Sequence, residues 1–106
     1  MTSPKSSGQP KKLLKLKAPF AIRRVSGNSM LPTLKPGQLI LVRQWFVRPK
    51  QGQIVVVRHN GLDKIKRIKE LAGGKVYIVG DNSVQSTDSR SFGWITANQI
   101  KAVVLV

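Results

Sequence analysis

The stretch IVVVRHNGLDKIKRIKELAGGKVYIVG (residues 54–80) decides the fold, because it contains three strand-like segments separated by two turn signals. β-Branched residues fill its first and last segments, and such residues favour strands. The dipeptides Asn60-Gly61 and Gly73-Gly74 are typical of the tight turns that join neighbouring strands. The stretch therefore predicts consecutive β-strands.

The same alternation of apolar runs and turn residues extends outward in both directions. The further strand-like runs are AIRRV (21–25), LILV (39–42) and IKAVVLV (100–106), and the further turn signals are Pro36-Gly37 and Gly52. Helical periodicity is weak, except for one short turn around residues 95–100. A chain of 106 residues with 41% hydrophobic residues suits one domain. We expect residues 19–106 to form one mainly β domain, built as a compact sheet or partial barrel.

Residues 1–18 have a different composition, in which Ser, Pro, Gly and Gln accompany five lysines. Such a segment buries too little apolar surface to offset the entropy of ordering, which predicts a flexible basic tail. Its lysines also interrupt its leucines, so it lacks the apolar stretch of a secretory signal. Elsewhere no apolar run approaches the roughly 20 residues of a membrane span. We therefore expect no transmembrane segment and a cytoplasmic protein.

The formal net charge of +15 raises the question of a polyanionic partner, either nucleic acid or an anionic membrane surface. The charge is spread along the chain, since twelve of the 19 Lys and Arg residues precede residue 60 and the others follow it. Aromatic residues that would stack on bases are few. A weak contact of the basic surface with membrane or nucleic acid is thus an alternative to a plain solvated surface.

The residue types exclude several kinds of chemistry. Without cysteine the chain has no disulfide, thiolate nucleophile or cysteine-based zinc site, and its single histidine excludes a multi-histidine metal site. We expect no metal and no cofactor. Hydroxyl groups remain, and two polar segments present them beside turn-forming residues: SGNSMLPTLKPG (26–37) and GDNSVQSTDSR (80–90).

A serine such as Ser29 becomes an effective nucleophile only when a base removes its proton. His59 is the one histidine that could act as this base, although a lone histidine at a strand end is more often structural. A lysine could act only if burial and neighbouring cations lowered its pKa. By this reasoning Lys64, Lys66 and Lys69 are equal candidates.

These lysines lie in the segment KIKRIKEL (64–71), which has an unusual pattern for a strand. Alternation places Lys64, Lys66 and Ile68 together on one face, and the other face is equally mixed. An ordinary two-faced strand would have one apolar side. The segment is therefore expected either to form an edge of the sheet or to line a site.

The segment 80–90 holds two of the four acidic residues of the chain, Asp81 and Asp88. Paired carboxylates suggest acid/base chemistry or a metal site, but no third acidic or histidine ligand lies near them in the sequence. An ion pair between Asp88 and Arg90 that braces the loop is the favoured interpretation.

Three segments in this order, SGNSMLPTLKPG, IKRI (65–68) and GDNSVQSTDSR, resemble the catalytic boxes of type I signal peptidases, and the resemblance covers residues 24–106. Self-cleaving repressors of the SOS response share a turn similar to the first box. The resemblance implies that Ser29 is the nucleophile and that its backbone N–H serves the oxyanion hole. It also implies that Lys66 is the general base and that Ser86 orients the lysine.

The same resemblance assigns structural roles. It implies that Asp88 and Arg90 form an ion pair, and other residues that match the boxes are Met30, Pro32, Gly80, Asp81 and Asn82. Some members of the family carry a serine that adds a second oxyanion donor two residues before the nucleophile. Here Gly27 occupies that position.

Signal peptidases carry a membrane helix and often a second β region between the lysine and GDN boxes, neither of which this sequence shows. The opening NSMLPTLKPG, the run VVVRH and the ending DSRSFG (88–93) resemble the nickel-type superoxide dismutase maturation proteases. That resemblance implies removal of an N-terminal extension from a nickel superoxide dismutase precursor, with the nickel belonging to the substrate. The alternatives are general signal peptidase-like processing at a membrane surface and a non-catalytic, basic nucleic-acid-binding module.

Overall fold

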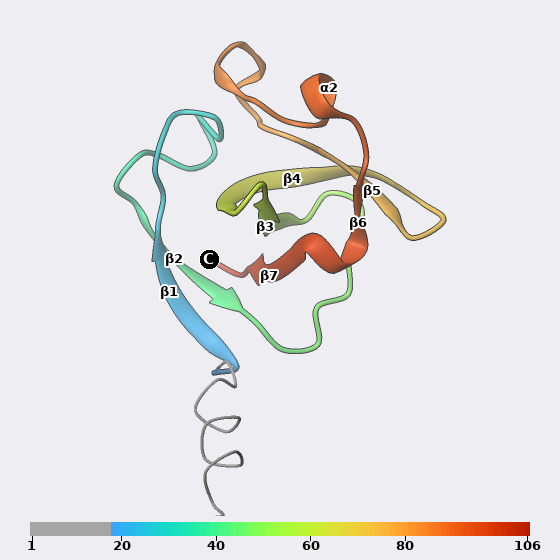
Figure 1. Ribbon diagram of the computed structural model, residues 1–106. Coiled ribbons are helices and arrows are strands. Elements are labelled where there is room, and N and C mark those ends of the chain that lie inside the picture. The colour runs from blue at the N-terminus through green and yellow to red at the C-terminus, as the bar shows by residue number, and fades with distance from the viewer. Residues whose placement is uncertain (1–17) are drawn as a thin grey trace, which may run out of the picture.

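The computed structural model describes residues 18–106 as a mainly β structure built on one antiparallel seven-stranded sheet (Figure 1). The basic tail expected at residues 1–18 falls almost wholly outside the described residues. The strands are β1 (Phe20–Arg24), β2 (Leu39–Arg43), β3 (Ile54–His59), β4 (Leu62–Ala72), β5 (Lys75–Val79), β6 (Ile95–Thr96) and β7 (Ile100–Val104). The short helices are η2 (Ser83–Gln85), α2 (Ser89–Phe92) and η3 (Ala97–Gln99). The predicted fold class is confirmed.

The strand order in the sheet is β1-β2-β7-β3-β4-β5-β6, so the last strand of the chain lies between β2 and β3. The hairpins β3-β4 and β4-β5 arise from the quoted stretch, as predicted. At the first turn both Asn60 and Gly61 have positive φ, 51° and 76°, which a two-residue turn between twisted strands favours. Asn tolerates this conformation better than most residues, and glycine adopts it freely.

Two hydrophobic clusters pack on opposite faces of the central strands. Val55 and Val57 of β3 belong to one cluster with Ile68, whereas Val56 belongs to the other with Met30. Successive strand residues point to opposite faces, so a strand covered on both sides needs an uninterrupted apolar run. This explains the sequence IVVV, and it explains why none of the three valines is more than 2% exposed.

Strand β4 lies between β3 and β5, so only its first part has the free edge that was one of the two expectations for KIKRIKEL, and Lys64 and Lys66 also line the pocket described below. Its residues 62–67 pair with β3, and its residues 67–72 pair with β5. In the described part of the chain, residues 62–66 therefore have a strand partner on one side only. The edge strand β1 likewise pairs with β2 alone among residues 18–106. Two free strand edges result, and both border the pocket described below.

The helical elements are short. The helix η3 lies where the sequence predicted one turn. The helix η2 lies within the segment 80–90 and α2 begins in it, although only loop was expected there. Asp88 caps the N-terminus of α2, because its side chain accepts a hydrogen bond from the Arg90 backbone N–H. Within residues 18–106, no helix has both the length and the apolar character needed to cross a membrane.

Candidate active site

Ser29 lies in a loop between β1 and β2, residues 26–37, here called the Ser29 loop. Met30 and Leu34 of this loop are buried, at 1% and 6% exposure, and both belong to the cluster that contains Val56. The Leu34 N–H donates to the Met30 carbonyl at 2.9 Å, which closes a turn around the exposed Pro32. The apolar anchors hold the backbone of the loop, and the Ser29 side chain remains half-buried at its surface.

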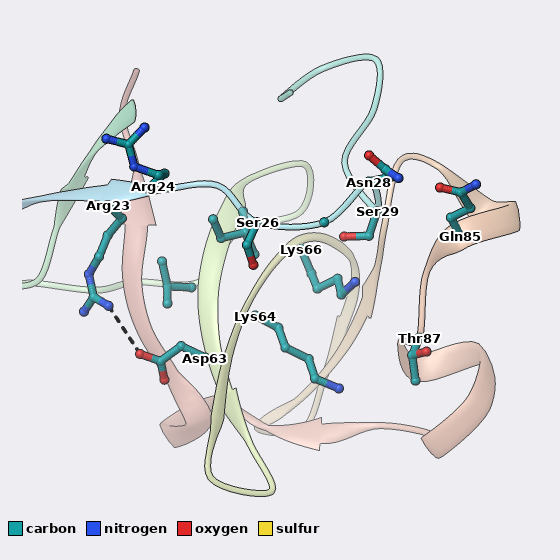
Figure 2. A pocket seen from close by; sticks show the side chains of 13 residues that line it. Arg23, Arg24, Ser26, Asn28, Ser29, Asp63, Lys64, Lys66, Gln85 and Thr87 are labelled. Atoms are coloured by element: carbon teal, nitrogen blue, oxygen red, sulfur yellow. Dashed lines mark hydrogen bonds and ion pairs between the residues drawn. The ribbon is translucent and has the colours of Figure 1, made fainter. Parts of the chain in front are cut away.

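Ser29 and Lys66 line the same pocket, which has a volume of about 380 Å³ and lies between the end of β1 and the first half of β4 (Figure 2). Among the residues described, no hydrogen bond joins the Ser29 hydroxyl to Lys66. The Lys66 amine instead donates to the Ser86 hydroxyl at 3.0 Å. The direct hydrogen bond of about 3 Å that a serine nucleophile and its base would make is thus not formed between the Ser29 hydroxyl and the Lys66 amine.

The Ser86 hydroxyl connects Lys66 to a buried carboxylate. It accepts from the Lys66 amine and donates its own proton to Asp88 Oδ2 at 2.5 Å. Because Asp88 is anionic and can only accept, the Ser86 proton is committed to it. Ser86 must therefore act as an acceptor toward Lys66, which fixes the orientation of the amine.

Lys66 is a buried lysine, with 4% of its surface exposed. Burial lowers the pKa of Lys66, the positive charges of Lys64 and Arg90 lower it further, and the charge of Asp88 partly opposes the shift. The buried position therefore favours the neutral amine more than water would. This distinguishes Lys66 from Lys69, which is exposed to solvent.

Asp88 is fully buried and receives several hydrogen bonds. Its carboxylate accepts from the Gly80 N–H at 2.7 Å, from Ser86, and from the guanidinium and backbone N–H of Arg90. Burial alone would raise the pKa of Asp88, but the hydrogen bonds from Arg90, Ser86 and Gly80 outweigh it and hold this pKa well below its usual range. The structure thus contains the Asp88–Arg90 ion pair that the sequence favoured.

Asp81 has a separate role that sequence reasoning missed. It accepts two hydrogen bonds from Arg67, both at 2.8 Å, and one from the Thr33 hydroxyl at 2.5 Å. This carboxylate therefore joins the Ser29 loop to β4 at the residue next to Lys66. Strand alternation was the available signal, because it places Arg67 on the face opposite Lys66, where it can reach a different carboxylate.

Gly80 and Asn82 hold the Ser29 loop from the other side. The Asn82 backbone N–H donates to the Ser29 carbonyl at 2.8 Å, and its side-chain amide donates to the Asn28 carbonyl at 3.0 Å. A Cβ atom added to Gly80 would lie 2.2 Å from Ser86 Oγ and 2.6 Å from the Ser29 carbonyl oxygen. Glycine is therefore required here by the close approach of two backbone segments.

Other candidates from the sequence take no part in the hydrogen bonds that link Lys66, Ser86 and Asp88. His59 stacks on the Phe92 ring, with centroids 4.0 Å apart, and is not among the residues that line the pocket. Gly27 lines the pocket but offers no side-chain donor. Lys64 lines it too, with its amine 5.2 Å from the Phe92 ring centroid. Within residues 18–106, no three His, Asp or Glu side chains cluster in a way that could hold a metal ion.

The sequence of the chain is similar to those of known peptidases. Residues 8–102 match the family described as Peptidase S24-like. The chain is also 35% identical over 71 residues to Signal peptidase I of Buchnera aphidicola subsp. Baizongia pistaciae (strain Bp), a match that covers 50% of this chain. It spans only 23% of the length of that relative. Because the family match covers most of the sequence, the chain belongs to the Peptidase S24-like family.

Proposed function

We propose that this protein is a serine endopeptidase in which Ser29 is the nucleophile and Lys66 the general base. The observation that carries the proposal is the buried Lys66 amine, which is bonded to Ser86 and shares one pocket with Ser29. An ordinary surface lysine is almost fully protonated at neutral pH, whereas a desolvated lysine can accept a proton. Membership of the Peptidase S24-like family supports the reaction class.

The reaction would proceed in two stages. The Ser29 oxygen attacks the carbonyl carbon of the scissile peptide bond while its proton passes to Lys66, and the negative oxygen of the intermediate accepts a hydrogen bond from the Ser29 N–H. Lys66 then gives the proton to the leaving amine, and an acyl ester remains on Ser29. Lys66 next removes a proton from water, which attacks the ester carbon. The bond to the Ser29 oxygen breaks, Lys66 returns the proton to that oxygen, and the peptide leaves with its new carboxyl end.

The two free strand edges give the substrate a place to bind. The pocket is bordered by Arg23 and Arg24 of β1 and by residues 63–66 of β4, and among residues 18–106 each of these segments has a strand partner on one side only. An extended peptide placed there can form main-chain hydrogen bonds with either edge, as in other cases of strand addition. Such binding favours a flexible segment over a folded domain, so an N-terminal extension is a suitable target.

The proposed substrate is accordingly a precursor protein that loses an N-terminal extension. The similar Signal peptidase I has a name that implies this type of reaction. The nickel superoxide dismutase precursor is our specific candidate, on the basis of the segments VVVRH and DSRSFG. Cleavage of this precursor in the cytoplasm is part of the same proposal.

The test is cleavage of purified nickel superoxide dismutase precursor, followed by mass spectrometry of the products. The wild-type protein should produce one new N-terminus, while Ser29→Ala and Lys66→Ala should each produce none above background. Ser83→Ala and Lys69→Ala are matched controls because both residues are exposed, and they should cleave normally. Cleavage that persists in Ser29→Ala would exclude the proposed mechanism, and cleavage of other precursors only would exclude the substrate.

A second candidate, processing at an anionic membrane surface, is supported by one exposed face of β1 and β2. Phe20, Ile22 and Leu39 are 51%, 67% and 56% exposed, and the strand register places them on the same face as Arg24 and Arg43. Apolar and basic side chains together suit the surface of an anionic bilayer. Sedimentation with phosphatidylserine vesicles tests this, and Ile22→Ser should then reduce both the bound fraction and the cleavage of vesicle-bound precursor.

A further inference from the structure

Lys64 differs from every other charged residue that lines the pocket. Arg23 forms an ion pair with Asp63 at 3.3 Å, and Arg58 also binds Asp63, so the carboxylate of the pocket is already shared by two cations. Arg24 donates to the Gly37 carbonyl at 2.8 Å, and Figure 2 shows its side chain directed away from the pocket. Lys66 donates to the Ser86 hydroxyl. In the part of the chain that the structure describes, the Lys64 amine forms neither an ion pair nor a hydrogen bond.

The position of the Lys64 amine is nevertheless defined. The side chain is half-buried, and its amine lies over the Phe92 ring at 5.2 Å from the centroid. A cation held over an aromatic ring has lost part of its freedom before any ligand binds, which lowers the entropic cost of pairing it with an anion. Figure 2 shows Lys64 extending from β4 on the side of Thr87, within the pocket lining.

Strand geometry gives the position of Lys64 relative to the scissile bond of a bound peptide. Lys64 lies two residues before Lys66 on the same face of β4, so the two side chains emerge about 6.7 Å apart. An extended peptide that lies along β4 has the same repeat. If its scissile carbonyl is at Ser29 and Lys66, the side chain two residues away along the peptide lies level with Lys64.

We propose that Lys64 forms a subsite for an acidic side chain, Asp or Glu, located two residues from the scissile bond of the substrate. This inference rests on the proposed peptidase function and gives it a charge specificity. The cations Arg23 and Arg58 around Asp63 add to the positive potential at the same pocket. A basic substrate side chain at that position would face Lys64 without a compensating carboxylate and would be disfavoured.

The test compares cleavage of peptides that differ at one position. A diverse mixture of peptides is first digested and its cleavage sites are read by mass spectrometry. One of the peptides that is cleaved is then synthesised in pairs, with Glu or Gln at a single position near the scissile bond. The value of kcat/KM is measured for both peptides of each pair. A preference for Glu of about three- to fivefold at a position two residues from the bond is expected, which is the size of a partly exposed ion pair. It should shrink as salt is added.

The variants Lys64→Gln and Lys69→Gln separate the subsite from the general charge of the protein. The ratio of kcat/KM for the Glu and Gln peptides should fall to about one in Lys64→Gln and stay at the wild-type value in Lys69→Gln. Using this ratio removes any effect of the substitution on catalysis itself. Lys64→Glu should reverse the preference and favour Lys over Gln at the same position.

The outcomes distinguish the two proposals. If peptides are cleaved but the Glu preference is absent, or survives in Lys64→Gln, the subsite is wrong and the peptidase function stands. If wild-type protein cleaves no peptide and no precursor, the proposed function is wrong and the subsite is excluded with it.

Discussion

Gly80 lies directly against the backbone of Ser29, so closely that a Cβ on Gly80 would be 2.6 Å from the Ser29 carbonyl oxygen. The same position lies against Ser86, which binds the Lys66 amine. One glycine thus separates the loop of the candidate nucleophile from the residue that orients the candidate base. The spacing of these groups depends on the absence of a single methyl group.

The variant Gly80→Ala should therefore lose activity. The new methyl group must push Ser29 and Ser86 apart, and a displacement of about 1 Å in a catalytic group can reduce the rate about 100-fold. The measurements are kcat/KM for cleavage of the precursor and the melting temperature of the variant. Ser83→Ala, an exposed change in the neighbouring helix η2, serves as the control and should have wild-type activity.

The variant Lys66→Met should be inactive but more stable than wild type near neutral pH. Burial lowers the pKa of Lys66 in the folded protein. As the pH drops below about 10.5, Lys66 of the unfolded chain binds a proton more readily than Lys66 of the folded protein, which lowers the free energy of unfolding. Methionine fills a similar volume without this cost, and we expect a gain of about 1–2 kcal/mol at pH 7. Urea denaturation at pH 7 measures it, and a less stable Lys66→Met would contradict the assigned burial.

The pH dependence of activity should follow the proton on Lys66. Because the proposed base is the neutral amine, kcat/KM should rise with pH and level off below the ordinary lysine pKa. Lys64 contributes to the lowering of the Lys66 pKa, so Lys64→Gln should move this rise to higher pH. Lys69→Gln should leave the profile in place. A pH profile that is unchanged in Lys64→Gln would remove the electrostatic contribution of Lys64.

The variant Asp88→Asn should cost about 2–4 kcal/mol of stability, because it leaves several buried donors without their anionic acceptor. Asp63→Asn is the matched control, since its ion pairs are partly exposed, and it should cost less than about 1 kcal/mol. The Asp88 pKa is depressed in the fold, so its stabilising effect is present above about pH 4 and is lost as the pH falls toward the folded value. Denaturation curves at pH 7 and pH 3 should therefore differ less in Asp88→Asn than in wild type.

The sequence predicted the strands well because the strand propensities and the turn residues of residues 54–80 favour the same structure. The runs of β-branched residues and the Asn60-Gly61 turn all agree with the observed hairpins. It could not predict α2, because four residues carry no helical period, and this helix depends on the Asp88 side chain as its cap. The path of β7 between β2 and β3 was also inaccessible, since local pattern says nothing about strand order.

The candidate site was predictable in part. Residue types and strand alternation narrowed the lysine candidates for the general base to a few residues of β4, but they did not separate Lys64 from Lys66. Both lie on the same face, and only the partner differs: Lys66 reaches Ser86, and Lys64 lies over Phe92. Such partners come from segments distant in sequence, so only the folded structure or a family resemblance can assign them.

The carboxylate of Asp81 joins Thr33 to Arg67 on residues that do not line the pocket. The loop and the strand that carry the candidate dyad are therefore fastened together from behind, away from the surface that a substrate would touch. The pocket wall formed by β1 takes no part in this fastening. Residues of that wall could therefore be substituted to change the substrate sequence that binds, while the Asp81 contacts keep Ser29 and Lys66 in the same relative position.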